Sequence, residues 1–199
     1  METKFNQSKK ILALTQSAIF IALATVLSFL PIYEMPMGGS VTLASMLPIL
    51  FIGLKFGYKW GFASSGIYAV IQLSQALIKG NVFIYCTTFG TVLICALFDY
   101  IVPFAILGAS AFAKPKGEGK LSIVKASVTF GVTIFIRFVC HYITGVAIWG
   151  QWAPEGVGKY LYSLLYNGQY MLPELAITLV IGVLLMSSTE IEKLLTKEK

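Results

Sequence analysis

Apolar runs long enough to cross a lipid bilayer recur along this chain, and no other feature limits its possible folds as strongly. A hydrocarbon core about 30 Å thick requires roughly 20 apolar residues in helical conformation. Of the 199 residues, 57% are hydrophobic and only 12% are charged, and the mean hydropathy is +0.79. Because lipid cannot satisfy backbone polar groups, each run is expected to be a helix. The sequence therefore predicts an all-α integral membrane protein.

Six membrane-spanning helices are predicted, at residues 11–30, 41–54, 58–77, 89–112, 122–148 and 160–186. The second run is short and contains Pro48, which predicts a tilted, kinked or incomplete crossing. The first run is expected to stay in the protein as a helix, because five further apolar runs follow it and no cleavage site precedes a soluble region. The loops at 31–40, 80–81, 114–120 and 151–159 are too short for another domain, so residues 1–199 are expected to form a single membrane domain.

The distribution of lysines predicts the orientation of the bundle. Short cytoplasmic loops retain an excess of Lys and Arg, and an even number of crossings places both termini on one side. The side that carries the termini has Lys4, Lys9, Lys10, Lys55, Lys59, Lys114, Lys116, Lys120, Lys125, Lys193, Lys197 and Lys199, whereas the other has Lys79 and Lys159. Both termini are therefore predicted to be cytoplasmic. This topology accounts for the net charge of +6, and no nucleic-acid partner is expected.

The cysteines and the histidine provide no metal site. Cys86, Cys95 and Cys140 have no paired spacing, so each is expected to be a small buried hydrophobe. A single histidine without a Cys-x-x-Cys motif supplies too few ligands of the usual type. We expect neither a metal nor a cofactor.

Ionisable residues inside the spans are the most informative positions, because a charge in hydrocarbon is costly and normally faces the interior of the bundle. Asp99 and His141 are predicted to lie in the outer layer of the membrane, and Arg137 and Glu174 near its middle. The second pair is expected to form a structural salt bridge between the last two spans. For Asp99 a ligand counter-ion and a structural hydrogen-bond partner are both open, and His141 could equally be a histidine bonded to neighbouring backbone.

Polar residues on the last two spans form two stripes at helical spacing. The stripes consist of Ser163, Asn167, Tyr170 and Glu174 on the last span, and Arg137, His141 and Thr144 on the span before it. Aromatic residues gather at the same end, where an interfacial aromatic belt can explain Trp152 and Tyr160 but not the amide of Asn167. A cavity between the stripes would suit a flat, cationic heteroaromatic ligand, held by stacking, cation–π attraction and hydrogen bonds to its edge.

Three sequence blocks resemble one family of membrane proteins. The stretch from Arg137 to Leu184 contains an H-x3-G-x3-W pattern, at His141, Gly145 and Trp149, followed by YSLLYN from Tyr162 to Asn167. LFDYIV at residues 97–102 and MPMGGSV at residues 35–41 agree in the same order. The chain thereby resembles the thiamine-specific S components of energy-coupling factor (ECF) transporters, which are bacterial vitamin uptake systems of the plasma membrane.

This resemblance implies a protein that captures thiamine from outside and delivers it through a partner module, made of a transmembrane scaffold subunit and two ATPase subunits. By the same resemblance, Asp99 and His141 contact the aminopyrimidine or ring nitrogens, and Asn167 and Tyr162 donate or accept hydrogen bonds. The ligand-stacking residues implied are Trp149, Tyr100 and, on the third span, Tyr68.

The chain departs from the family pattern at two positions. Some relatives have a glutamate where this chain has Asp99, one methylene shorter. Some also have a glutamate near the position of Leu43, where this chain has no carboxylate, and Glu34 in the preceding loop is the candidate replacement.

The first span carries Ala18 and Ala22 in an Ala-x3-Ala arrangement, which permits close approach of another helix. From the residues alone, packing within the chain and docking to a partner are both open; the resemblance implies docking to the scaffold subunit.

Two other functional classes were weighed. An intramembrane enzyme could use Asp99 and His141 as an acid–base pair, but no nucleophile or metal motif accompanies them, so we do not expect an enzyme. A self-sufficient, proton-coupled secondary transporter of a cationic heteroaromatic molecule could use Asp99, His141 and Glu174 as a proton relay. Such carriers commonly contain internal repeats, which are missing from this sequence.

Overall fold

The computed structural model describes residues 2–80, 82–116 and 120–196. Asn81, residues 117–119 of a predicted loop, and residues 197–199 with the predicted cytoplasmic Lys197 and Lys199 lie outside the described residues. The helical elements are α1 (Glu2–Ser28), α2 (Leu47–Phe56), α3 (Tyr58–Lys79), η1 (Phe83–Tyr85), α4 (Phe89–Cys95), η2 (Ala96–Ile101), α5 (Val102–Ala105), η3 (Ile106–Ala113), α6 (Ile123–Ala147), η4 (Trp149–Trp152), α7 (Lys159–Met186) and α8 (Thr189–Thr196). A short antiparallel hairpin, β1 (Pro31–Glu34) and β2 (Ser40–Thr42), joins α1 to α2.

Within the described ranges, five helical segments are long and apolar enough to cross a membrane. They are Gln7–Ser28, Tyr58–Lys79, Phe89–Ala113, Ile123–Ala147 and Lys159–Met186. Their bounds lie close to five of the predicted spans. A mostly helical membrane protein is therefore confirmed.

The second predicted span, residues 41–54, has a different structure. Its first residues belong to β2 and a turn at Ala44, where φ is +56°, and only the ten-residue α2 is helical. Pro48 lies in the first turn of α2, where its missing N–H costs no helical hydrogen bond, so the helix begins there. Residues Leu47–Lys55 are all buried. Irregular backbone is tolerated at this depth because protein, not lipid, surrounds it.

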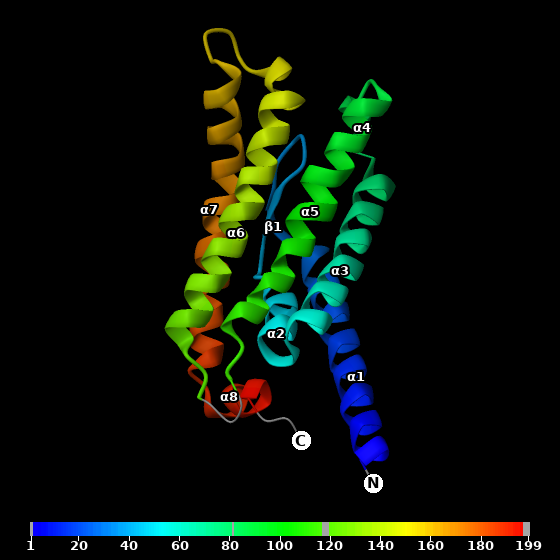
Figure 1. Ribbon diagram of the computed structural model, residues 1–199. Coiled ribbons are helices and arrows are strands. Elements are labelled where there is room, and N and C mark those ends of the chain that lie inside the picture. The colour runs from blue at the N-terminus through cyan, green and yellow to red at the C-terminus, as the bar shows by residue number, and fades with distance from the viewer. Residues whose placement is uncertain (1, 81, 117–119, 197–199) are drawn as a thin grey trace.

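The helices form one elongated bundle with both chain ends at the same end (Figure 1). The start of α1 and the whole of α8 lie at the bottom of the view, whereas the loops before α4 and between α6 and α7 lie at the top. The hairpin lies beside α5 and α6 in this view, and α2 follows below it, so the two together lead the chain back down inside the bundle. The pocket described below lies in the upper half.

The third long segment, Phe89–Ala113, is not a regular α-helix. Residues Ala96–Ile101 form a π-turn between α4 and α5. Pro103 has no N–H to donate to the carbonyl of Asp99 four residues earlier, so the regular α ladder cannot continue through this point. Such π-turns are frequent at functional sites, and this one carries Asp99 and Tyr100.

Candidate functional site

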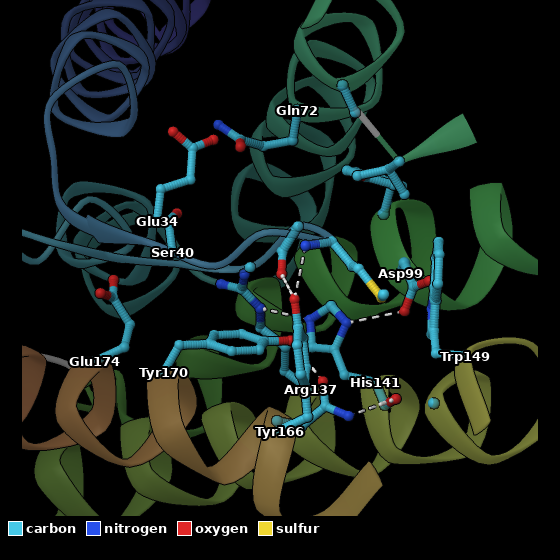
Figure 2. Close-up of a pocket in the computed structure, with 18 of the residues that line it drawn as sticks. Glu34, Ser40, Gln72, Asp99, Arg137, His141, Trp149, Tyr166, Tyr170 and Glu174 are labelled. Carbon is cyan, nitrogen blue, oxygen red and sulfur yellow. Dashed lines mark hydrogen bonds and ion pairs between the residues drawn. The ribbon is translucent and has the colours of Figure 1, made fainter. Parts of the chain in front are cut away.

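A cavity lined by many polar side chains lies inside the bundle, and Figure 2 shows the residues around it. Residues of the β1–β2 hairpin, α3, η2, α6 and α7 line it, together with Ser28 of α1, Phe104 of α5, Trp149 of η4 and Val82. Six of the seven predicted binding residues line the cavity: Asp99, Tyr100, His141, Trp149, Tyr162 and Asn167. The structure thus brings residues from three separate segments to one site.

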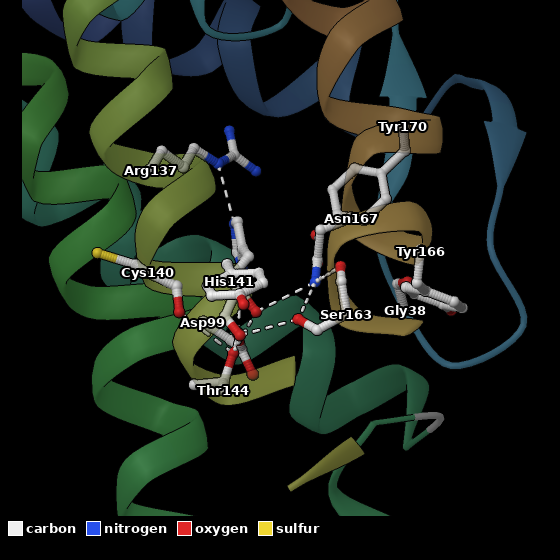
Figure 3. Close-up of polar contacts among 11 residues, drawn as sticks. Gly38, Asp99, Arg137, Cys140, His141, Thr144, Ser163, Tyr166, Asn167 and Tyr170 are labelled. Atoms are coloured by element: carbon white, nitrogen blue, oxygen red, sulfur yellow. Dashed lines mark hydrogen bonds and ion pairs between the residues drawn. The ribbon is translucent and has the colours of Figure 1, made fainter. Parts of the chain in front are cut away.

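A chain of hydrogen bonds links Arg137, His141 and Asp99 (Figure 3). The Nε–H of Arg137 donates to His141 Nε2 at 3.2 Å, and Nδ1 of the same ring lies 3.0 Å from Asp99 Oδ1. Because Nε2 accepts, the arrangement is satisfied by an imidazole that carries its proton on Nδ1. The Arg137 guanidinium is also held 4.1 Å above the centre of the Phe104 ring. The imidazole is therefore fixed in one orientation from both sides.

One oxygen of Asp99 is fully occupied and the other is not. Oδ1 accepts hydrogen bonds from His141 and from the hydroxyl of Thr144. Oδ2 is buried and has no partner in the part of the chain that is described. An unsatisfied buried acceptor costs about 1–3 kcal/mol, more when charged, and a donor on a ligand would remove this cost.

Aromatic rings form one wall of the cavity. Tyr100 is stacked against Phe83 with centroids 5.8 Å apart, and Trp149 meets the ring of Tyr85 edge-on at 5.7 Å. One face of α7 contributes three more rings to the cavity lining, those of Tyr162, Tyr166 and Tyr170. The ring of Tyr166 contacts the rings of both other tyrosines. Flat π surfaces on one side of a site that contains a carboxylate suit a flat, cationic ring.

Asn167 joins α6 to α7 behind the cavity. Its Nδ2 donates to the backbone carbonyls of His141, at 3.2 Å, and Ser163, at 2.9 Å, while its Oδ1 accepts from the Tyr170 hydroxyl at 2.7 Å. The helices meet closely here because Gly145 has no side chain: a Cβ would lie 2.0 Å from Ser163 Oγ. Asn167 thus has a positioning role in addition to lining the cavity.

The β1–β2 loop covers the cavity and is bonded to α7. The hydroxyl of Tyr166 accepts from the N–H of Met37 at 2.9 Å and donates to the carbonyl of Gly38 at 3.1 Å. Gly38 and Gly39 both have positive φ, and a Cβ on Gly39 would lie 2.6 Å from the Tyr170 ring. The loop can lie this close to Tyr170 only because residue 39 is a glycine, and a Cβ on Gly38 would lie 2.7 Å from the side chain of Val82.

Two sequence predictions differ from the structure. Tyr68 does not line the cavity: it is fully buried below it and packs edge-on against Phe104 at 5.5 Å. Arg137 and Glu174 form no direct ion pair in the described structure. Both carboxylate oxygens of Glu174 are taken by Thr42, at 2.5 Å from its backbone N and 2.7 Å from its hydroxyl.

The position of Glu174 also bears on the carboxylate that some relatives carry near Leu43. Glu174 reaches across from α7 to Thr42, the residue directly before Leu43, and lines the cavity. Leu43 itself is 54% exposed. Glu34 lines the cavity too, but it is paired with Lys79 at 2.8 Å. A carboxylate is thus present beside this segment, contributed by α7.

Both the sequence and the fold of this chain are similar to those of known proteins. The family model described as "Thiamine transporter protein" matches residues 14–193. The chain belongs to this thiamine transporter family. The thiamine transporter ThiT of Bacillus subtilis is 33% identical over 190 residues, covering 90% of this chain and 93% of the relative. ThiT of Lacticaseibacillus paracasei is 27% identical over 192 residues, with 90% and 89% covered.

A solved structure of ThiT from Listeria monocytogenes has the same fold. It superimposes with a TM-score of 0.67 at 22% sequence identity, covering 92% of this chain and 97% of that chain. The resemblance drawn from the sequence blocks at 35–41, 97–102 and 137–184 is therefore confirmed.

Sequence reasoning missed one wall of the cavity in this thiamine transporter family member. Four residues of α3 line it at helical spacing, namely Gln72, Gln75, Ala76 and Lys79. Gln75 exchanges hydrogen bonds with Ser28 of α1, at 3.1 and 3.3 Å. The i, i+3, i+4, i+7 spacing is visible in the sequence, but no ionisable residue or family motif marks Gln72 or Gln75.

The predicted docking residues lie far from the cavity. Ala18 and Ala22 are both exposed on α1, one turn apart on the same face. Large hydrophobic side chains flank them, including Ile19 at 60% and Leu23 at 46% exposure. Both methyl groups are therefore accessible from outside the bundle.

Proposed function

We propose that this chain is the thiamine-binding subunit of an ECF-type uptake transporter, which captures thiamine from the outside and delivers it through a partner ATPase module. The observation that carries the proposal is the cavity itself. One wall offers stacked aromatic rings, and beside it Asp99 has an unpartnered buried oxygen. Thiamine contains a cationic thiazolium ring and an aminopyrimidine with a donor amino group, so it matches both. Membership of the thiamine transporter family supports the same ligand.

We infer specific roles for the cavity residues. The anionic Asp99 attracts the cationic ligand and accepts a hydrogen bond through Oδ2, and His141 presents an imidazole held by Arg137. Tyr100 and Trp149 stack on the rings of the ligand. Tyr162 and Asn167 provide hydrogen bonds at the α7 side.

The proposed topology is a single domain with six crossings in the bacterial plasma membrane and cytoplasmic termini. The second crossing consists of the β1–β2 hairpin and α2, which return the chain through the bundle interior (Figure 1). The end that carries both termini also carries most of the lysines, which favours the cytoplasmic side. The cavity then opens to the outside, as capture of an external vitamin requires.

Delivery is proposed to depend on a transmembrane scaffold subunit and two ATPase subunits. Ala18 and Ala22 on α1 are exposed, so a scaffold helix can approach their backbone closely. The second candidate is a self-sufficient, proton-coupled carrier of a cationic heteroaromatic molecule. The hydrogen bond between His141 and Asp99 favours it, because these two residues are members of the proposed proton relay.

The test of ligand identity is a titration of the purified protein by tryptophan fluorescence. Trp149 lines the cavity, so thiamine should quench the emission saturably, whereas riboflavin and biotin should not. Absence of a thiamine response would refute the proposal. Uptake by reconstituted vesicles then separates the two transport mechanisms: the ECF type requires partner subunits and ATP, and the secondary carrier requires a proton gradient alone.

A further inference from the structure

Two buried polar atoms in the cavity have no partner among the described residues, and they are of opposite kinds. Asp99 Oδ2 is an acceptor, and Gln72 Nε2 is a donor. Both residues line the same cavity. Buried polar groups are paired in the great majority of cases, so two orphans in one site indicate a ligand that supplies both missing partners. Asp99 is already assigned above, whereas Gln72 has no role.

The polar neighbours of Gln72 on α3 are satisfied within the protein, which sets Gln72 apart. Gln75 is bonded to Ser28, and Lys79 is paired with Glu34. The amide of Gln72 extends from α3 toward the side of the cavity where Glu34 lies, without forming a hydrogen bond to it (Figure 2). Gln72 thus keeps a free donor inside the cavity while its neighbours hold the wall together.

The wall that contains Gln72 differs in chemistry from the rest of the cavity lining. Its cavity-lining residues from α1, β1 and α3 are Ser28, Glu34, Gln72, Gln75, Ala76 and Lys79, none of which is aromatic. The rings of Tyr100, Trp149 and the α7 tyrosines lie on the other segments. A ligand whose rings stack on the aromatic wall therefore presents a non-ring, polar substituent to α3.

We propose that Gln72 is a specificity-determining residue, whose Nε2–H donates a hydrogen bond to the oxygen of a flexible hydroxyalkyl substituent on the ligand. For thiamine this group is the hydroxyethyl arm of the thiazolium ring. The inference rests on the proposed function and deepens it. A site with a buried donor discriminates against an analogue that lacks the acceptor, because the donor is then left unpaired.

The test is a cycle between a protein substitution and a ligand substitution. Gln72→Met removes the amide at nearly constant volume, and a thiamine analogue with ethyl in place of hydroxyethyl removes the oxygen. One hydrogen bond contributes a net free energy of about 1 kcal/mol to binding, which corresponds to roughly fivefold to tenfold in Kd. The wild type should bind thiamine more tightly than the analogue by that factor. Gln72→Met should lose this preference, and its Kd for the analogue should differ from the wild-type value by less than about twofold.

A matched control and an internal ratio keep the result interpretable. Gln169→Met makes the same change on the exposed outer face of α7, away from the cavity, and should preserve the preference. Because the preference is a ratio of two Kd values for one variant, a reduced folded fraction does not alter it. Equal weakening of both ligands, or no weakening, by Gln72→Met overturns the assignment of Gln72. If wild type fails to bind thiamine at all, the proposed function fails instead.

Discussion

Nδ1 of His141 lies 3.0 Å from Oδ1 of Asp99, although 42 residues separate the two along the chain. The contact joins α6 to the π-turn at Ala96–Ile101. It leaves the second oxygen of the carboxylate unpartnered in the cavity. The pair therefore both connects two helices and presents an acceptor to a ligand.

Substitution of Asp99 should separate charge from shape. Asp99→Asn retains an oxygen that accepts from His141 and Thr144. It replaces the unpartnered second oxygen by an NH2 donor and removes the negative charge. We expect thiamine affinity to fall by about tenfold to a hundredfold, since hydrogen bonds to charged groups contribute about 1.5–3 kcal/mol. Calorimetric titration measures the loss. Asp99→Glu, which restores the residue of some relatives, should bind more tightly than Asp99→Asn; the reverse order would contradict a role for the charge.

Tyr166→Phe should loosen the loop over the cavity. The substitution removes the hydroxyl that bonds to Met37 and Gly38, and leaves the ring in place. We expect faster hydrogen exchange in residues 35–40 and a severalfold higher dissociation rate for the ligand, measured by mass spectrometry and stopped-flow fluorescence. Tyr142→Phe on α6, outside the cavity lining, is the control and should change neither. Unchanged exchange in Tyr166→Phe would show that the two bonds do not hold the loop.

Two glycines of α6 provide a matched test of helix packing. A Cβ at Gly145 would lie 2.0 Å from Ser163 Oγ, whereas a Cβ at Gly131 meets nothing within 4 Å. Gly145→Ala should destabilise the protein by about 1–3 kcal/mol through overpacking, and Gly131→Ala should be neutral or slightly stabilising. Thermal unfolding in detergent compares the two. Equal melting temperatures would mean that α6 and α7 can separate at this point without cost.

The polar contacts of Glu174 predict which residue it is coupled to energetically. Glu174→Gln, Thr42→Val and Arg137→Met, singly and in pairs, form two double-mutant cycles. Because Thr42 contacts Glu174 directly and Arg137 does not, we expect a coupling energy of about 0.5–3 kcal/mol in the first cycle and a smaller one in the second. Denaturation in detergent supplies the free energies. A larger coupling to Arg137 would restore the salt-bridge prediction.

The sequence predicted the long helices well because membrane burial leaves a strong signal. A window of about 20 apolar residues identifies a span regardless of its neighbours. The signal failed at residues 41–54, because burial inside protein replaces contact with lipid there and a strand with a ten-residue helix suffices. Pro103 marks a break in the helix near Asp99 but does not by itself specify a π-turn, and no local pattern was used to predict the hairpin.

The candidate site was predictable where charge or a family motif marked a residue. Asp99, His141 and Trp149 were found in this way, and all line the cavity. Gln72 was missed because it is not ionisable and lies outside the three sequence blocks that resemble the family. The Arg137–Glu174 pair was inferred from similar depth on two neighbouring helices, which does not determine which way a side chain points: Glu174 turns to Thr42.

The exposed alanines of α1 test whether delivery needs a docked partner. Ala18→Trp and Ala22→Trp place a large ring where we propose that a scaffold helix lies against α1, and an exposed position should accept it without loss of stability. We expect thiamine binding to remain within about twofold of wild type, because both positions lie outside the cavity. ATP-dependent uptake with partner subunits should fall at least tenfold.

Val128→Trp on α6, at a position 61% exposed, is the control and should transport normally. If both alanine variants transport normally, the partner docks elsewhere on the protein; if Val128→Trp is equally impaired, bulk in the membrane rather than docking is responsible.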